Sequence, residues 1–200
     1  MAVYLREDEV GHDPNLIGFP TLGSCMGLAV VTDNGLYGFH MPPGHEDRIG
    51  AFSAIYAGNS PEILLSCCRF SHRYKGANPF FKWLQEIKIF GRAIGYKGLV
   101  EGVNLSTLLG SANGYIEDKT ESAYCQYTLA SDGTVSVGAS LTSNVTATKT
   151  VDLNTPIRRV ASSGQSSVPY KSNVITGVAS TSGNTMKVPT GNESIFSFTL

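Results

Sequence analysis

The sequence lacks the features that mark a membrane protein or a secreted precursor. No apolar run approaches the roughly 20 residues that a transmembrane helix needs. The first ten residues contain four charged side chains and no apolar core of the kind found in secretory signal peptides. We therefore expect no membrane partner, and either a cytoplasmic location or export by a route that does not use a signal peptide.

Neither sign of charge is in excess. The 15 Lys and Arg residues nearly balance the 16 Asp and Glu residues, for a net charge of −1. Proteins that bind nucleic acid usually carry a basic excess, so we expect no nucleic-acid partner. The glycine-rich stretch 91–102 contains neither a P-loop nor a dinucleotide-binding fingerprint, and we expect no cofactor.

Cysteine is scarce, and its spacing gives no metal pattern. The four cysteines form no CxxC pair, and without a signal peptide free thiols are favoured over disulfides. They are Cys25, Cys67, Cys68 and Cys125. Three histidines would complete a metal site with Cys25, but their separations of 28 and 5 residues match no zinc pattern, so we expect no metal. These are His12, His40 and His45.

The composition favours a globular protein of the α+β class. Of the 200 residues, 42% are hydrophobic and 16% are charged, which excludes a disordered chain. The first 140 residues alternate between strand and helix patterns. The patterns predict strands at 26–32, 36–41, 63–74 and 95–103, helices at 46–57 and 80–94, and a hairpin of 124–130 with 134–139. In the second helix we expect Phe81 and Leu84 on the buried face.

The segment 63–74 begins as a buried strand and then alternates between polar and apolar residues. As a continuous strand it would place Arg69, Ser71 and Arg73 on one face, beside His72. We interpret this face as a solvated strand edge rather than an anion-binding site.

The composition changes after Ser140, where Ser, Thr, Asn, Val and Gly dominate. Candidate strands there are 146–153, 174–179 and 195–200. The sequence leaves open whether they extend one sheet or form a small all-β appendage. We therefore divide the chain into a core, residues 1–140, and a β-rich extension, residues 141–200, packed on the same domain.

The segment 21–44 holds the strongest candidate site. Cys25 follows Gly23 and Ser24 at the start of one apolar run, and His40 ends the next run after a turn signal at 33–35. A thiol becomes a good nucleophile when a neighbouring imidazole removes its proton. A lone cysteine at the head of a strand is more often a small buried hydrophobic residue, which is the competing interpretation.

The register of this ribbon decides whether the two side chains meet. With a loop at 31–34, Cys25 and His40 are direct cross-strand partners, with Cβ atoms about 5 Å apart, close enough for a thiolate–imidazolium pair. With a two-residue turn at Asn34 and Gly35, Ala29 faces His40 and Cys25 lies about 13 Å away. The catalytic interpretation therefore requires the longer loop or a bulge.

Neighbouring residues supply the other parts of an acyl-transfer site. Gly23 and Ser24 permit a tight turn that aims backbone N–H groups at a developing oxyanion. A third group should orient His40, and Thr21 is the first choice, with Ser24 and Tyr37 as alternatives.

The stretch Thr21-Leu-Gly-Ser-Cys25, followed by an apolar strand, a turn and His40-Met-Pro-Pro43, resembles the CheD glutamine deamidases of bacterial chemotaxis. The cysteine-to-histidine pattern is also similar to the catalytic domain of cytotoxic necrotizing factor toxins and related effectors. In these families the cysteine is the nucleophile and the histidine its base. The resemblance implies those roles for Cys25 and His40. It also implies a CheD-like α/β sandwich with a mixed β-sheet core, two main helices and a β-rich C-terminal extension.

Two departures from the CheD pattern stand out. The family's orienting threonine lies six residues before the cysteine, where this chain has Phe19, whereas Thr21 keeps the same strand parity. The Ser/Thr-rich tail after Ser140 has no counterpart in CheD. The tail favours a diverged, toxin-like effector that is secreted into a host cell.

We therefore predict a cysteine-dependent protein-glutamine amidohydrolase. It would convert a glutamine of a target protein to glutamate with release of ammonia, or act as a transglutaminase if an amine replaces water. Its partner would be a target protein that bears a reactive glutamine. Two other functions remain open: a non-catalytic β-rich binding or structural module, and a cysteine peptidase that uses the same pair.

Overall fold

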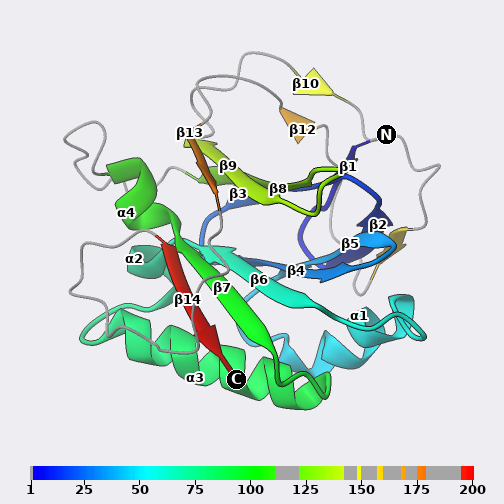
Figure 1. Ribbon diagram of the computed structural model, residues 1–200. Helices are drawn as coiled ribbons and strands as arrows, with labels where there is room; N and C mark the ends of the chain where they lie inside the picture. Colours follow the sequence, from blue (N-terminus) through cyan, green and yellow to red (C-terminus); the bar gives the residue numbers. More distant parts are fainter. Residues whose placement is uncertain are drawn as a thin grey trace.

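The computed structural model describes residues 2–110 and 122–141 and five short segments of the tail, 148–149, 157–159, 168–169, 175–178 and 195–200. Two β-sheets lie face to face, and helices cover the outer face of the larger one (Figure 1). Strands outnumber helices, and the predicted α+β class is confirmed. The predicted alternation of strands and helices did not indicate that the strands divide into two layers.

The larger sheet has seven strands. Their order is β11 (Ile157–Arg159), β2 (Glu9–Asp13), β5 (Gly35–Met41), β4 (Met26–Thr32), β6 (Ile63–Cys68), β7 (Leu99–Asn104) and β14 (Ile195–Thr199). All neighbours run antiparallel except β6 and β7, so this sheet is mixed.

The smaller sheet has five strands. Their order is β1 (Val3–Tyr4), β3 (Leu16–Leu22), β8 (Ala123–Leu129), β9 (Val135–Leu141) and β13 (Ile175–Val178). The hairpin predicted around residues 131–133 is confirmed as β8 and β9. A separate pair is formed by β10 (Thr148–Lys149) and β12 (Val168–Pro169).

The tail contributes strands to both sheets. β14 pairs with β7 and β11 with β2 in the larger sheet, while β13 pairs with β9 in the smaller one. The predicted strands at 174–179 and 195–200 are confirmed, and most of the one at 146–153 lies outside the described residues. The tail strands therefore neither extend a single sheet nor all stand apart as an appendage.

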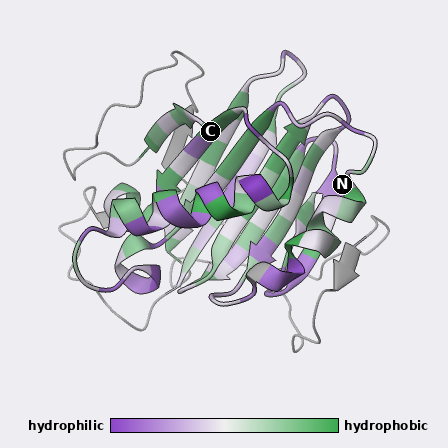
Figure 2. Ribbon diagram, turned by 90° about the horizontal axis from the view of Figure 1, so that it is seen from below, coloured by the Kyte–Doolittle hydropathy of each residue, from purple (hydrophilic) through white to green (hydrophobic). Residues whose placement is uncertain are grey.

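Both predicted helices form. A 3₁₀ turn (Glu46–Arg48) leads into α1 (Ile49–Ile55), and the longer helix is α3 (Pro79–Ala93), with Pro79 in its first turn. Figure 2 shows α3 lying across the strands of the larger sheet. The short helix α4 (Leu105–Gly110) follows β7 directly. Within the described ranges, no helix combines the length and the apolar character needed to cross a membrane.

Two expectations about helices and strands were wrong. The strand β6 ends at Cys68, and residues 70–73 form the helix α2 (Phe70–Arg73) instead of continuing as a strand. The side chains of Asn104 and Ser106 accept the backbone N–H groups of Phe70 and Ser71, which stabilises the start of this helix. Arg69 is 1% exposed, so the segment is not a solvated edge.

The predicted buried face of α3 also needs correction. Leu84 is buried as expected, but Phe81 is 51% exposed. The place expected for Phe81 is taken by Trp83, which is fully buried and packs against Gly102 of β7. A Cβ atom at Gly102 would lie 2.2 Å from the Trp83 ring, so only glycine allows the helix to approach the sheet this closely.

Strand β4 is apolar from Met26 to Val31 because both of its faces are covered. Met26 and Leu28 face the helices, and Ala29 and Val31 face the smaller sheet. A Cβ atom at Gly27 would lie 2.6 Å from the Phe19 ring of β3. This glycine therefore permits close contact between the two sheets at the position next to the candidate site.

Glu101 of β7 is a buried carboxyl group. It is 1% exposed, and neither of its oxygens has a hydrogen-bond partner among the described residues. It lies on the same face of β7 as Val103, towards the smaller sheet. Burial raises the pKa of Glu101 from 4.5 to about 7. The folded protein therefore holds this proton more tightly than the unfolded chain does.

We expect Glu101→Gln to stabilise the protein at about pH 8 and to change its stability little near pH 4. Because the folded-state pKa is raised, the contribution of the protonated carboxyl is complete below pH 4.5 and is lost as the pH rises through about 7. The loss is at most about 3 kcal/mol, at about 1.4 kcal/mol for each pH unit. Urea unfolding of the variant and the wild type at both pH values measures the difference in their free energies of unfolding. The contributions of the other titrating groups are common to both proteins and cancel in this difference.

The exposed Glu62→Gln is the matched control for this measurement. It removes a carboxylate without relieving a buried charge, so it should change the stability by a similar small amount at both pH values. An equal effect of Glu101→Gln at the two pH values would contradict the expectation.

Candidate functional site

The β4–β5 hairpin has a register that neither sequence-based alternative anticipated. Thr32 pairs with Gly35, so Asp33 and Asn34 form the turn, and His40 pairs with Gly27. The Thr32 hydroxyl accepts the Asn34 N–H at 3.1 Å and donates to the Gly35 carbonyl at 3.3 Å, which stabilises this turn. Both the four-residue loop at 31–34 and the turn at Asn34 and Gly35 were therefore wrong.

This register makes Cys25 and His40 diagonal neighbours on one face. Cys25 lies directly before β4, two residues from the partner of His40, and both side chains face the smaller sheet. Diagonal neighbours in an antiparallel pair lie about 7 to 8 Å apart. The structure therefore brings the two residues to the same place but not into the direct pair that the sequence predicted.

His40 is held by a backbone carbonyl. Its Nδ1 lies 2.8 Å from the Leu5 oxygen, and the residue is 0% exposed. Because a carbonyl only accepts, Nδ1 carries the proton and Nε2 presents a bare lone pair. Nε2 has no hydrogen-bond partner in the described structure. This tautomer is the one that a general base requires.

The group that orients His40 is therefore the Leu5 carbonyl and not the hydroxyl of Thr21. Thr21 is exposed, has a φ of 58°, and donates its hydroxyl to the Pro20 carbonyl at 2.7 Å. Leu5 and His40 are 35 residues apart. Since any residue supplies a backbone carbonyl, no sequence signal identifies Leu5 in this role.

Burial shifts the pKa values of both candidate catalytic groups so that the neutral form of each is favoured. It lowers the pKa of His40 to about 4, although the Leu5 hydrogen bond acts in the opposite direction. Burial also raises the pKa of Cys25 to about 12, with the Glu7 carboxylate as the next cause. At neutral pH the site holds a thiol and a neutral imidazole, so the expected thiolate–imidazolium pair is absent from the resting structure.

The proposed oxyanion turn is partly occupied. The Gly23 N–H donates to the Thr21 carbonyl at 2.9 Å, and the Ser24 carbonyl accepts the Arg73 guanidinium at 2.7 Å. Gly23 therefore closes the turn before Cys25 and has no N–H left for a substrate.

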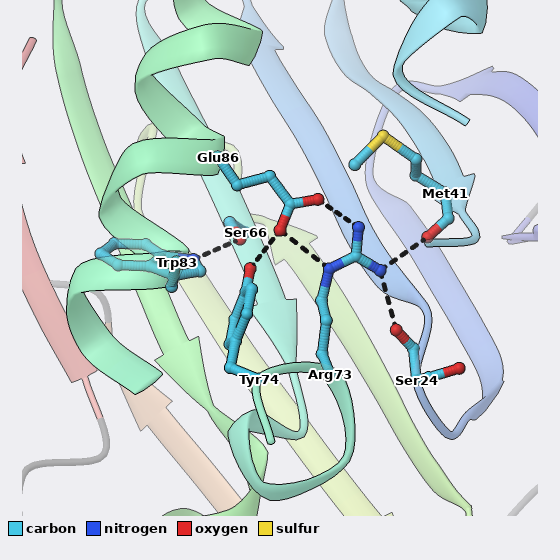
Figure 3. Close-up of polar contacts among 7 residues, drawn as sticks. All are labelled: Ser24, Met41, Ser66, Arg73, Tyr74, Trp83 and Glu86. Atoms are coloured by element: carbon cyan, nitrogen blue, oxygen red, sulfur yellow. Dashed lines mark hydrogen bonds and ion pairs between the residues drawn. The ribbon is translucent and has the colours of Figure 1, made fainter. Parts of the chain in front are cut away.

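Arg73 links the two strands of the candidate site to α3 (Figure 3). Its Nε lies 2.9 Å from a Glu86 oxygen and its Nη2 contacts the other oxygen, forming a two-pronged ion pair. The Tyr74 hydroxyl donates to the same carboxylate. The remaining Nη1 donates to the carbonyls of Ser24 at 2.7 Å and Met41 at 3.4 Å.

These contacts make Arg73 a positioning residue. Its side chain is 3% exposed, and its two carbonyl partners directly precede Cys25 and follow His40 in the chain. The sequence pattern predicted this arginine on a solvated strand edge, whereas its side chain is buried. Residues 70–73 form the helical turn α2, which is stabilised by contacts with Asn104 at the end of β7 and Ser106 of α4, and this turn directs the Arg73 side chain inward.

A second imidazole lies close by and is held by a carboxylate. The Asp8 carboxylate accepts a hydrogen bond from His45 Nδ1 at 2.8 Å and forms an ion pair with Arg48 at 2.7 Å, and the Asp8 N–H donates to the His40 carbonyl at 2.9 Å. Asp8 has a φ of 63°, a conformation that non-glycine residues rarely adopt. The His45 side chain is 31% exposed, so it is more accessible than His40. The 37-residue separation of Asp8 and His45 gave no sequence signal for this pair.

Among the described residues, no three or more His, Cys, Asp or Glu side chains are grouped so that they could hold a metal ion. No protein-family model matches the chain, and no curated protein matches it. The functional interpretation therefore depends on the geometry around Cys25 and His40.

Proposed function

We propose that the chain is a protein glutamine deamidase in which Cys25 is the nucleophile and His40 its base. One observation carries the proposal: the Leu5 carbonyl fixes His40 with an unpaired, unprotonated Nε2, on the same face of the ribbon as the Cys25 thiol. A buried polar nitrogen without a partner is costly for folding. A role as proton acceptor gives a reason for that cost.

The reaction would proceed in two steps. His40 Nε2 takes the thiol proton while the sulfur attacks the side-chain amide carbon, and the backbone N–H of Cys25 stabilises the oxyanion. The C–N bond breaks, and His40 returns the proton to the departing nitrogen, which leaves as ammonia. Water then attacks the thioester, giving up a proton through His40 to the cysteine sulfur. Glutamate replaces glutamine, and the neutral pair is restored.

The resting pKa values place a condition on this mechanism. Because burial raises the pKa of Cys25 to about 12 and lowers that of His40 to about 4, proton transfer from the thiol to the imidazole is unfavourable in the closed site. Proton transfer must therefore accompany attack on the substrate. Binding of the target must also widen the turn at residues 23–25, because Cys25 is 7% exposed.

The burial of both residues favours a second candidate, a non-catalytic binding or structural module. In that case Cys25 fills space between the sheets and His40 is a core histidine. A cysteine peptidase would use the same pair on a peptide bond. For the deamidase, we further propose that the target is a protein of a host cell and that the chain acts there as a secreted effector.

Intact-mass spectrometry of target proteins distinguishes the three functions. We expect incubation of lysate proteins with the wild-type chain to add about one dalton to a target and to release ammonia, and Cys25→Ser to do neither. Hydroxyl replaces thiol with little change in volume, so folding should be retained. Cleaved targets would identify a peptidase instead. Unchanged ammonia release by the Cys25→Ser variant would exclude Cys25 as the nucleophile.

A further inference from the structure

The outward face of α3 carries the two most exposed large apolar side chains of the described residues. Phe81 is 51% exposed and Ile89 is 54% exposed, and the two lie about two helical turns apart. Figure 2 shows α3 in front of the strands of the larger sheet, with apolar and polar bands along it. Exposed apolar side chains gathered on one element mark interaction surfaces more often than scattered ones do.

The same face is cationic, although the whole chain has a net charge of −1. Lys82, Lys88 and Arg92 are exposed on α3. The only acidic residue of the helix is Glu86, and Arg73 and Tyr74 occupy its carboxylate. The exposed charge of the helix is therefore positive.

A groove of about 340 Å³ adjoins this face. Its lining includes Pro43, Gly44, Arg73, Lys82, Gln85 and Ile89. Arg73 also donates to the carbonyls of Ser24 and Met41. The groove therefore adjoins the backbone on both sides of the cysteine–histidine pair.

We propose that this face and groove, which we name the α3 groove, bind an acidic segment of the target protein that also carries apolar side chains. The proposal rests on the proposed function and adds the class of partner. Carboxylates of the segment would face Lys82, Lys88 and Arg92, and its apolar side chains would cover Phe81 and Ile89. A glutamine of the bound target would reach Cys25 around the end of the β4–β5 ribbon, where the Ser24 and Met41 carbonyls contact Arg73.

The concave groove favours a protein segment over an anionic membrane. A membrane is flat on the scale of one helix and would contact the exposed side chains without entering the groove beside Arg73. A protein segment is therefore expected to lose affinity when groove residues are replaced, whereas binding to a membrane would depend on the exposed charges alone.

Binding is tested with the Cys25→Ser chain, which cannot turn over substrate. The probe is a fluorescein-labelled peptide in which Asp and Glu alternate with Leu around one Gln, and the reference is the same peptide with Lys in place of the acids. We expect fluorescence anisotropy to show binding of the acidic probe only. Lys82→Glu should weaken that binding about tenfold, and so should Phe81→Ser combined with Ile89→Ser.

The exposed Lys97→Glu is the matched charge control, because Lys97 lies outside α3 and the groove. It should weaken binding less than about twofold. Equal binding of both peptides, or an equal loss with Lys97→Glu, would overturn the α3 groove. Binding to phosphatidylserine vesicles with the same dependence on Lys82, without binding of the peptide, would also overturn it.

Turnover separates this proposal from the proposed function. Ammonia release by the wild-type chain is measured for the acidic probe and for a short glutamine peptide without flanking acids. We expect a higher kcat/KM for the acidic probe, and expect Lys82→Glu to reduce only that advantage. Equal kcat/KM values for the two peptides would overturn the α3 groove without contradicting the deamidase. Peptide binding without ammonia from either peptide supports the groove and counts against the deamidase.

Discussion

Replacing His40 by Asn is expected to lower the kcat/KM of deamidation by about 100-fold to 10,000-fold, the range that general acid–base catalysis contributes. The asparagine amide keeps a donor near the position of Nδ1 for the Leu5 carbonyl but has no counterpart of Nε2. The substitution therefore removes the base and retains the hydrogen bond that holds it. Ammonia release from a glutamine peptide measures the effect, and circular dichroism verifies the fold.

The pH dependence of kcat/KM is a second measurement, and a purely structural role of His40 would leave it unchanged. Because the imidazole must be neutral to accept a proton, the wild-type kcat/KM should fall as the pH drops through about 4, the pKa of the buried His40. His45→Asn is the informative comparison, since Asp8 orients that second, more accessible ring. If activity is lost with His45→Asn and kept with His40→Asn, the base is His45 and the assignment to His40 is wrong.

Replacing Arg73 by Met is expected to reduce the free energy of unfolding by about 3 to 5 kcal/mol, the cost of breaking a buried ion pair. The variant leaves the Glu86 carboxylate, 13% exposed, without its guanidinium partner. It also removes the donor that reaches the carbonyls of Ser24 and Met41. Urea unfolding followed by the fluorescence of Trp83, the single tryptophan, measures the loss.

Two further variants separate the ion pair from simple loss of packing. Arg92→Met removes an exposed arginine from α3 and should change the stability by less than about 0.5 kcal/mol. The double variant Arg73→Met with Glu86→Leu should recover most of the loss, because it leaves no unpaired carboxylate. A double variant as unstable as Arg73→Met alone would show that the packing of the arginine stem, and not the ion pair, stabilises this region.

Local sequence patterns predicted most of the secondary structure. Apolar periodicity and a proline at the helix start identified the segment that forms α3, and the turn at residues 131–133 identified the β8–β9 hairpin. The same periodicity misplaced Phe81, because Gly102 provides a recess that Trp83 fills. The α2 helix was missed because its first N–H groups are satisfied by side chains distant in sequence, those of Asn104 at the end of β7 and Ser106 of α4.

The sequence by itself determined the α+β class, the two main helices and the placement of Cys25 at the start of one strand and His40 on the next. Only the tertiary structure decided their register, the burial that keeps both groups neutral, and the Leu5 carbonyl and Arg73 side chain that hold the site. The physical reason is the distance along the chain over which each interaction acts. Periodicity and turn chemistry act over a few residues, whereas desolvation and hydrogen bonds to distant backbone groups depend on how the two sheets and α3 come together.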